Sequence, residues 1–420
     1  MLGAGIGVCR GSTMTLDFPC PQTPRVSVVI VAKSKLDLLR ACLQSVARFA
    51  PSAIPFETIV VLNEAGPDTE AELRAMATGV KVARSPVNLG FAGGANRGRS
   101  LAHGEFLLLH HDDAEVEAGW MEALVQTADE HPEVGAVGSK VFYPDGRLQG
   151  AGWILWRDAL TSPPWIGEAP VPTAFDRPRA VDYCGTSSLL VRAAAWDAVG
   201  GLEESLYPAY YADVDLSMAL RRLGFVVWYQ PASRIVHHHG ASSNLRLRIF
   251  AVQRNRQVFV AKWGDALEGH DPPERDSPSA IARAMTRAEA FAEDCRRKAP
   301  PVLASPTTKA AFDPAAHELQ CYERNRAFQN AYVKHLTETL EQTEKQATQS
   351  LAEHDASSAA IKNLTEALRA AEEQVRQTTA ERDALSAASN AMLGSSSWRL
   401  TAPLRATADM LRRLKWRQDA

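Results

Sequence analysis

Two adjacent carboxylates, Asp112 and Asp113, directly follow a short apolar run, Phe106 to Leu109. An unbroken run of this kind is typical of a strand buried on both faces of an α/β sheet, and such sheets bind ligands at the carboxyl ends of their strands. Two carboxylates about 4 Å apart repel by about 1 kcal/mol in water. A hard divalent cation such as Mg²⁺ or Mn²⁺ reverses that repulsion. The pattern therefore indicates either a metal site or an ordinary solvated turn.

A second acidic pair, Asp213 and Asp215, lies in the segment Y-Y-A-D-V-D-L-S-M-A-L-R-R-L. The spacing of its apolar residues predicts a helix that starts near Asp213. At a helix start, Asp213 is either a cap or a general base that points into a cleft. Both interpretations stay open on the sequence alone.

Three consecutive histidines, 237–239, follow a strand-like segment. Neighbouring side chains in an extended segment point in opposite directions, so all three cannot bind one metal. We expect one of them to complete an oxygen-rich metal site and the others to have structural roles.

A glycine-rich segment, N-L-G-F-A-G-G-A-N-R-G, covers residues 88–98. Gly90, Gly93 and Gly94 permit a close approach of the backbone, and a helix is predicted to follow them. A loop of this kind at a helix N-terminus suits a phosphate or a nucleotide sugar. The G-x-G-x-x-G order of a dinucleotide site is missing, which argues against a Rossmann oxidoreductase. A simple helix-initiating turn is the alternative.

The flanking segments predict an α/β sheet that would hold these residues together. Apolar runs alternate with helical spacing from residue 26 onwards, as expected for a largely parallel sheet with right-handed crossovers. Residues 140–180 are predicted to form a long irregular loop that shapes an acceptor pocket. Its Trp153, Trp156 and Trp165 suit sugar stacking or core filling. The strands are expected at 26–31, 56–62, 80–83, 105–109, 134–138 and 182–192, and helices at 36–49, up to 76, and 118–130.

The segments outside the predicted sheet have a different composition. We expect a flexible N-terminus over residues 1–24 and a basic amphipathic helix over 244–263 that faces an anionic membrane or packs on the domain. A linker with a helix at 278–297 is predicted for 264–314, and a helical, coiled-coil region for 315–395. The apolar spacing of this coiled-coil region predicts weak self-association or the binding of a partner helix. Residues 396–420 are predicted to form a basic amphipathic tail. The seam residues are Ile361, Leu364, Leu368, Ala371 and Val375.

The overall composition is that of an ordinary globular protein. The chain has 420 residues, 45% of them hydrophobic and 23% charged, and a formal net charge of −3. That charge argues against wholesale nucleic-acid binding. The six cysteines form no C-x-x-C pair, and no apolar run is long enough to span a membrane. We expect a cytoplasmic protein, with peripheral contact to the inner face of the membrane as a further possibility.

The motifs together resemble glycosyltransferase family 2, the inverting transferases of GT-A type, and most closely its rhamnosyltransferase-like bacterial members. The resemblance covers roughly residues 25–263, the expected catalytic domain. It implies a Rossmann-like, mostly parallel sheet with flanking helices. It rests on the order and spacing of V-S-V-V-I-V-A-K-S-K, V-V-L-N-E-A-G-P-D, N-L-G-F-A-G-G-A-N-R-G, L-L-L-H-H-D-D-A-E-V-E-A-G-W, G-T-S-S-L-L-V-R, V-G-G-L, A-D-V-D-L and H-H-H-G-A-S-S.

The resemblance also implies roles for individual residues. Asp113 would be the ligand of a Mg²⁺ or Mn²⁺ ion that anchors a nucleoside diphosphate, and His237 would touch the metal or the diphosphate. Asp213 occupies the position of the catalytic base. Five further residues correspond to positions near the nucleotide or its sugar, and they are Asn63, Gly93, Gly94, Asn96 and Asp112.

The implied activity is metal-dependent transfer of a sugar, with inversion, from a nucleoside-diphosphate sugar to a hydroxyl of a growing bacterial surface glycan. The acceptor would be an O-antigen, a capsule or a cell-wall polysaccharide, free or lipid-linked. Three residues depart from the family pattern: His111, Asn63 and Ala212. Because Ala212 stands where a glutamate is usual, either a helper carboxylate is missing or Glu203, Glu204 or Asp215 replaces it. The alternative is a coiled-coil scaffold that carries a weakened transferase-like domain in a polysaccharide assembly complex.

Overall fold

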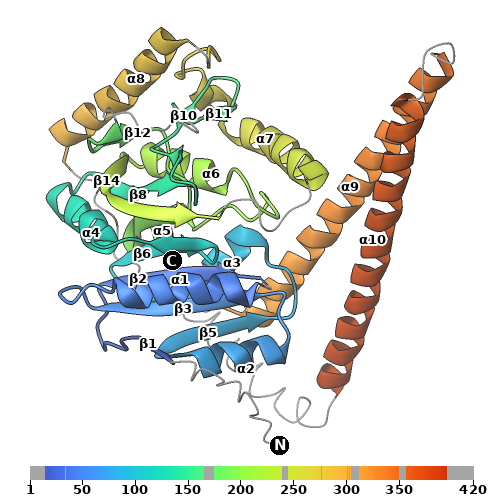
Figure 1. Ribbon diagram of the computed structural model, residues 1–420, viewed down its shortest axis with the longest axis horizontal. Coiled ribbons are helices and arrows are strands. Elements are labelled where there is room, and N and C mark those ends of the chain that lie inside the picture. The colour runs from blue at the N-terminus through green and yellow to red at the C-terminus, as the bar shows by residue number, and fades with distance from the viewer. Residues whose placement is uncertain are drawn as a thin grey trace, which may run out of the picture. The chain divides into compact units, whose positions relative to one another are not determined.

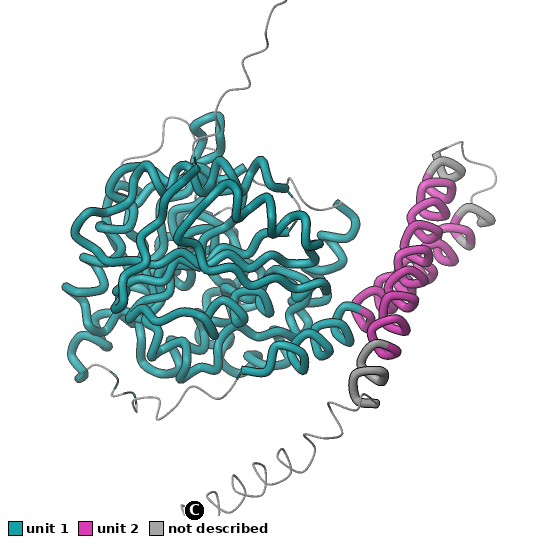
Figure 2. Tube along the Cα trace, turned by 90° about the horizontal axis from the view of Figure 1, so that it is seen from below, with its two compact units in different colours: residues 1–325 teal, residues 326–420 magenta. Residues whose placement is uncertain are grey.

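The chain divides into two compact units in the computed structural model, residues 1–325 and 326–420 (Figure 2). The structure describes residues 15–33, 35–164, 175–238, 245–275, 277–299, 301, 303, 312–349 and 356–394. The predicted basic tail, 396–420, and Trp165 lie outside these residues.

A ten-stranded sheet forms the centre of the first unit (Figure 1). Its main path runs β12-β14-β8-β13-β6-β2-β3-β5, with β7 paired to β14 and β9 paired to β8. The strands are β2 (Val26–Ala32), β3 (Phe56–Asn63), β5 (Val80–Ser85), β6 (Phe106–His111), β7 (Ala114–Val116), β8 (Val134–Phe142), β9 (Leu148–Gly150), β12 (Arg179–Val181), β13 (Ser188–Arg192) and β14 (Val226–His237).

The sheet is mixed, although its first half is parallel as predicted. β6, β2, β3 and β5 pair in parallel, because helices cross over between them. β13 then runs antiparallel between β6 and β8. The predicted α/β fold with flanking helices and a helical C-terminal region is confirmed. Two small ladders accompany the sheet: β1 (Leu16–Asp17) with β4 (Ala77–Thr78), and β10 (Ile154–Leu155) with β11 (Thr161–Ser162). β1 lies within the segment that we expected to be flexible.

Helices cover both faces of the sheet. One apolar core lies between the sheet and the face made by α1, α2, α4 and the end of α8, and the other lies against α3, α5 and α6. α7 packs on α6 through Phe259 and Trp263. The helices of this unit are α1 (Leu36–Arg48), α2 (Pro67–Met76), α3 (Gly90–Leu101), α4 (Trp120–Glu130), α5 (Ala193–Val199), α6 (Ala212–Arg222), α7 (Leu245–Leu267), α8 (Pro278–Arg297) and the start of α9 (Pro314–Gln349).

Helix α8 belongs to the folded unit and is not part of a linker. Its alanines at 280, 284, 288 and 292 are all buried. Arg287 on the same helix donates a hydrogen bond to the buried Asp182 at 2.5 Å. The first part of the predicted linker over 264–314 is therefore packed on the folded unit. The sequence gives little sign of this packing, because a stripe of alanines is only weakly apolar.

The second unit is a pair of long helices, the remainder of α9 and α10 (Ala356–Gly394), which lie side by side (Figures 1 and 2). Within this unit, Leu364 and Ala371 of the predicted seam are buried, as are Tyr332 and Leu336 of α9. Two of the five seam residues are thus buried within the chain itself, and the other three, Ile361, Leu368 and Val375, are half-buried.

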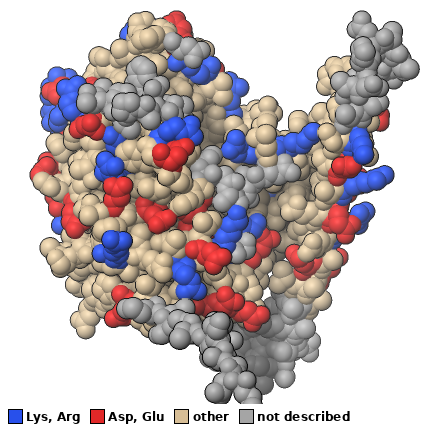
Figure 3. Space-filling view, in the orientation of Figure 1, with Lys and Arg blue, Asp and Glu red and all other residues tan. Residues whose placement is uncertain are grey.

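One face of the protein has mixed charge. On the face shown in Figure 3, basic and acidic side chains alternate over the part of the chain that is coloured. A search of the described helices finds none that is both long and apolar enough to cross a membrane.

Candidate active site

A strand register brings His237 to Asp113. After β6 the chain turns at Asp112 and Asp113 and returns as β7, which pairs with the end of β14. Ala114 lies opposite His237 in this ladder, and the His238 amide donates to the Asp113 carbonyl at 2.9 Å. His238 points the other way, with Nε2 2.8 Å from Glu115 Oε1. The expected alternation of side chains is therefore present, and His239 lies outside the described residues.

His111, Asp113 and His237 converge on one point. His237 Nε2 lies 3.1 Å from Asp113 Oδ1 and 3.3 Å from His111 Nδ1, and His111 Nδ1 lies 3.9 Å from the same carboxylate oxygen. The other nitrogen of His237 is 2.7 Å from Gln149 Oε1, so a proton on Nδ1 leaves the Nε2 lone pair facing the cluster. Ring lone pairs and a carboxylate this close repel unless a proton or a cation lies between them.

The three ligand atoms of this cluster suit a metal ion, since all lie within 4.8 Å of one another. Imidazole nitrogen and carboxylate oxygen together are a common ligand set for first-row divalent metals. Gln149 would then orient a ligand histidine through its second nitrogen, as outer partners usually do. His111, which stands where an acidic residue or asparagine was expected, lies inside the cluster and contacts Thr186 Oγ1 at 3.3 Å.

The neighbouring Asp112 lies outside this cluster. Its Oδ2 accepts a hydrogen bond from the Lys33 amide at 3.3 Å. Burial, followed by repulsion from Asp113, raises the pKa of Asp112 to about 6. Burial also raises the pKa of Asp113, but its contacts with His237 and His111, with no metal between them, outweigh this effect, so the pKa of Asp113 lies below the ordinary value. The two carboxylates differ because only Asp113 faces the imidazoles.

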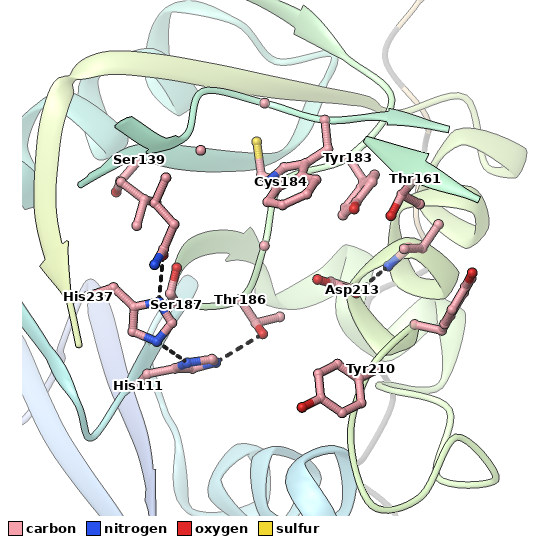
Figure 4. A pocket seen from close by; sticks show the side chains of 18 of the residues that line it. His111, Ser139, Thr161, Tyr183, Cys184, Thr186, Ser187, Tyr210, Asp213 and His237 are labelled. Carbon is pink, nitrogen blue, oxygen red and sulfur yellow. Dashed lines mark hydrogen bonds between the residues drawn. The ribbon is translucent and has the colours of Figure 1, made fainter. Parts of the chain in front are cut away.

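A cavity of about 560 Å³ extends from this cluster to Asp213. Figure 4 shows His111 and His237 on one side and Asp213 across from them. The walls come from β8, the segments around β9 to β11, the loop before β13 and the start of α6. The residues of these segments that line the cavity include Ser139, Val141, Tyr143, Gln149, Trp153, Leu160, Thr161, Tyr183, Cys184, Gly185, Thr186, Ser187, Tyr210, Tyr211 and Val214.

Asp213 lies in the first turn of α6 and is not the helix cap, because the helix begins at Ala212 after Tyr211. One carboxylate oxygen accepts from the Val214 amide at 2.9 Å. Burial raises the pKa of Asp213 to about 6, although the Val214 amide partly offsets this. A carboxylate with a pKa near 6 is a stronger base than an exposed aspartate and is still ionised at neutral pH.

The segment before Asp213 is held in an unusual backbone conformation. Tyr210 and Tyr211 have φ angles of 73° and 68°, which cost of order 1–3 kcal/mol each outside glycine. The buried Asn255 of α7 compensates by donating to the carbonyls of Leu206, Ala209 and Tyr210 at 2.9, 2.8 and 3.2 Å. Asn255 was missed in the sequence, where it is one polar residue in a basic helix.

The glycine-rich segment is largely a helix and only its start is a turn, which corrects the expected loop. Gly90 has a φ of +67°, but Gly93 and Gly94 lie within α3. A Cβ on Gly94 would lie 2.6 Å from Val31 Cγ1, so this glycine lets α3 pack against β2. A Cβ on Gly93 would lie 3.0 Å from Cys321 Sγ of α9. Both glycines thus serve helix packing in the described structure, and their contact with a nucleotide stays a prediction.

The two predicted asparagines bind neighbouring loops. Asn63, at the end of β3, accepts from the Leu89 amide at 2.7 Å and donates to the Gly90 carbonyl at 3.3 Å, which fixes the start of α3. Asn96 binds both the amide and the carbonyl of Leu202 at 2.9 Å. Neither residue lines the cavity, so the nucleotide contacts expected of them stay predictions.

No substitute for the missing helper carboxylate lines the cavity among the described residues. Asp215 accepts from Trp263 Nε1 at 2.7 Å and pairs with Lys262 at 2.9 Å, which attaches α7 to α6. Glu203 also pairs with Lys262, at 3.2 Å. Glu204 contacts Asn96 and residues of α9. The three candidates are therefore engaged elsewhere.

The loop over residues 182–187 is a further difference from the sequence prediction, which made 182–192 one strand. The strand β13 begins only at Ser188, and Tyr183 to Ser187 line the cavity. Gly185 is the only sequence signal of a break here. Of the predicted tryptophans, Trp153 lines the cavity and stacks on Tyr183 with ring centroids 5.7 Å apart, whereas Trp156 is fully buried.

Known proteins are similar to part of this chain. The O-antigen biosynthesis protein RfbC of Myxococcus xanthus is 30% identical over 236 residues, which cover 54% of this chain and 18% of that protein. An N-acetylglucosaminyl-diphospho-decaprenol L-rhamnosyltransferase of Mycobacterium tuberculosis is 27% identical over 171 residues, which cover 37% of this chain and 55% of that one. The chain thus spans less than two thirds of the length of these relatives.

One solved structure, GalNAc-T7 with UDP, GalNAc and Mn²⁺, superposes with a TM-score of 0.46 and 16% identity, covering 66% of this chain and 55% of the other. The family model described as Glycosyl transferase family 2 matches residues 27–197, which contain the turn with Asp112 and Asp113. Residues 27–197 accordingly match a glycosyl transferase family 2 domain.

Proposed function

We propose that the chain is an inverting, metal-dependent glycosyltransferase that moves a sugar from a nucleoside-diphosphate sugar to a hydroxyl of a growing bacterial surface glycan. One observation carries the proposal: a cluster suited to a divalent metal and a basic carboxylate, Asp213, face the same cavity. Such an arrangement fits a reaction in which a charged diphosphate leaves from one side and a hydroxyl attacks from the other.

The cluster of His111, Asp113 and His237 would hold the metal. Of the two predicted ions, two imidazole ligands favour Mn²⁺ over Mg²⁺. A bound metal supplies positive charge for the departing nucleoside diphosphate. As ligands, Asp113 would bind as a carboxylate and both histidines in their neutral form. Asp112, which accepts a hydrogen bond from the Lys33 amide, is next to Asp113 in the chain, and its expected contact with the nucleotide is part of the proposal.

Asp213 would accept the proton of the acceptor hydroxyl as that oxygen attacks the anomeric carbon. Tyr183, Trp153 and Tyr210 line the cavity near it and offer aromatic faces for a sugar ring. The two relatives named for O-antigen biosynthesis and for a rhamnosyltransferase support a surface glycan as the acceptor class. The donor sugar and its base are left open.

Peripheral membrane contact is part of the proposal for a lipid-linked acceptor. Leu245 and Ile249 at the start of α7 are exposed, with exposed fractions of 60% and 48%, and Arg246 lies between them. Arg248 and Val252 of the same helix line the cavity, so a membrane at this helix would lie beside the acceptor site. Binding to anionic vesicles with and without Leu245→Ser and Ile249→Ser tests this contact.

Donor binding by calorimetry tests the central proposal. UDP-, dTDP- and GDP-sugars are titrated into the full chain with Mn²⁺ or with EDTA. We expect one donor to bind with Mn²⁺ only, and Asp113→Ala to abolish the difference between the two conditions. Donor affinity that is the same with metal and with EDTA would contradict the assignment of Asp113.

A scaffold with a weakened transferase domain is the second candidate. It is favoured by Ala212 and by the engagement of Glu203, Glu204 and Asp215 outside the cavity. A folded chain that binds none of the donors would support it.

A further inference from the structure

A second cluster of metal-ligating side chains lies away from the cavity, where α9 begins. His317 and Cys321, one helical turn apart, face Glu204 from the loop after α5. His317 Nε2 lies 3.0 Å from Glu204 Oε1, and Cys321 Sγ lies 3.6 Å from both Glu204 Oε2 and His317 Nε2. Cys321 is fully buried and His317 nearly so. All three residues belong to the first unit.

The separations of these atoms match the edges of a tetrahedral zinc site. Zinc lies about 2.3 Å from a thiolate sulfur and about 2.0–2.1 Å from an imidazole nitrogen or carboxylate oxygen. At tetrahedral angles these bond lengths put sulfur about 3.5 Å from nitrogen or oxygen, and nitrogen about 3.3 Å from oxygen. The two contacts of Cys321 and the contact of His317 agree with these values within a few tenths of an ångström.

Glu204 and Cys321 have further hydrogen-bond partners, and Arg324 lies 3.6 Å from Cys321 Sγ. Asn96 donates to Oε1 at 2.8 Å and Arg324 donates to Oε2. A carboxylate has about four lone-pair positions, so both oxygens can keep these partners and still bind a metal. Gly93 faces the sulfur from α3, where a Cβ would come within 3.0 Å of it. A side chain at this position would press on the cluster.

We propose that Glu204, His317 and Cys321 form a zinc site that fixes the start of α9 to the transferase domain. Thiolate and imidazole ligands favour Zn²⁺ over the hard ions Mg²⁺ and Mn²⁺. One oxygen of Glu204, the nitrogen of His317 and the sulfur of Cys321 supply three donor atoms, and a water molecule would take the fourth position. On binding, the Cys321 thiol loses its proton to solvent, so the thiolate forms the Zn–S bond.

This site differs in chemistry from the cluster at the cavity. The cluster of His111, Asp113 and His237 contains no sulfur, so the two sites can be told apart by spectroscopy. The second site also holds a different part of the chain, because two of its ligands come from α9 and one from the loop before α6. Its existence does not depend on transferase activity.

Cobalt substitution tests the proposal on the full chain after removal of metal with a chelator. Cobalt bound to a thiolate gives a charge-transfer band in the near ultraviolet. We expect the band to reach the intensity of one thiolate-bound Co²⁺ per chain, to disappear when Zn²⁺ is added and to resist an excess of Mg²⁺. Cys321→Ser should abolish it, and His317→Gln should weaken Co²⁺ binding by more than the about 10–100-fold that loss of an outer partner costs.

Two matched variants serve as controls. Cys20→Ser removes an exposed cysteine elsewhere and should leave the band unchanged. Asp113→Ala alters the cavity cluster and should also leave it unchanged, so a failure of the proposed transferase function does not affect the result. The absence of a band in the wild-type chain, or its persistence in Cys321→Ser, would overturn the proposal. His317→Gln provides the same decision if Cys321→Ser does not fold.

Discussion

Two carboxylates near the cavity are held in opposite electrostatic surroundings. Asp213 is buried without a cationic partner that shifts it, so its pKa rises to about 6. Burial also raises the pKa of Asp113, but the contacts with His237 and His111 bring this pKa below the ordinary value. Groups whose pKa values are pushed apart in one site often divide their tasks. Here the division fits a proton acceptor at Asp213 and a permanent negative charge at Asp113.

Replacing Asp213 with asparagine separates these tasks. The amide keeps the size and can still accept from the Val214 amide, but it cannot take a proton from the acceptor. We expect kcat to fall by about 10²–10⁴-fold, the usual contribution of a general base. The dissociation constant of the donor with Mn²⁺ should stay within a factor of two or so, since Asp213 lies across the cavity from the metal cluster. Turnover close to that of the wild type would remove Asp213 from the mechanism.

The pKa of Asp213 also predicts a pH profile. Since the base must be ionised, kcat should rise with pH through an acidic limb centred near 6. Asp112 has a pKa of about 6 as well, so Asp112→Asn is the control and should retain the limb. The free energy of unfolding should change with pH in the opposite direction to kcat. Because the pKa of Asp213 is raised from 3.8 in the folded state, the contribution of Asp213 to stability is present below about pH 4 and is lost as the pH rises through about 6. Denaturant unfolding of wild type and Asp213→Asn between these pH values measures this difference.

The position of an individual site residue in the fold was predictable where a sequence motif places it at the end of a strand or helix. Asp113 and His237 meet because β7 pairs with β14. The apolar run before Asp113 and the strand-like segment before His237 can both be read in the sequence. Asn63 and Asn96 carry side chains suited to a nucleotide, yet their bonds go to the Gly90 and Leu202 backbone. An asparagine satisfies a loop backbone as readily as a ligand, so sequence alone cannot separate these roles.

At the scale of elements, α3 depends on glycine to approach the sheet. A Cβ on Gly94 would lie 2.6 Å from Val31 Cγ1. One helical turn later in α3, a Cβ on Gly98 would lie 2.3 Å from Val29 Cγ1. The sequence suggested that glycines here form a ligand loop. Instead, most of them let a helix lie close to β2, which places the turn at Gly90 beside the end of the sheet.

Gly94→Ala should therefore destabilise the protein although alanine favours helices. Overpacking of this kind costs about 1–3 kcal/mol. Gly264, in α7, is a matched control because a Cβ there meets nothing within 4 Å and its φ is not positive. Gly264→Ala should stabilise by about 0.5–1 kcal/mol, the helix preference of alanine over glycine. Urea unfolding of both variants measures the two signs, and equal effects would show that α3 can shift without cost.

Elements were predictable where their apolar period is strong and not where packing uses small or polar residues. The parallel strands β2, β3 and β6 are continuous apolar runs and were expected within a few residues of their bounds. The loop 182–187 has apolar neighbours on both sides, so it reads as strand. Helix α8 was located, but its buried face consists of alanines, whose weak apolar signal does not reveal that the helix belongs to the core.

At the scale of the whole molecule, the first unit is longer than the family resemblance. The motifs end near residue 263, whereas the compact unit extends to Asn325. The added part contributes α8, whose Arg287 pairs with Asp182 and Asp271, and the start of α9, whose His317 and Arg324 pair with Glu204. Of these partners, Asp182 and Glu204 lie in the domain itself, so the extra segment contributes to its packing and charge balance.

Truncation at two points tests where the folded unit ends. A chain that stops at Asn325 keeps α8 and every contact of Glu204, so we expect it to unfold with the midpoint of the full chain's first unit and to bind donor equally well. A chain that stops at Trp263 loses Arg287, the closer of the two arginines on the buried Asp182, and exposes Trp156. Removing one partner of a buried ion pair alone costs about 3–5 kcal/mol. That loss is comparable with the whole stability of many domains, so the shorter chain should fail to give a cooperative unfolding transition by circular dichroism. A shorter chain that unfolds cooperatively and binds donor would instead place the boundary where the motifs end and make α8 an accessory of the domain.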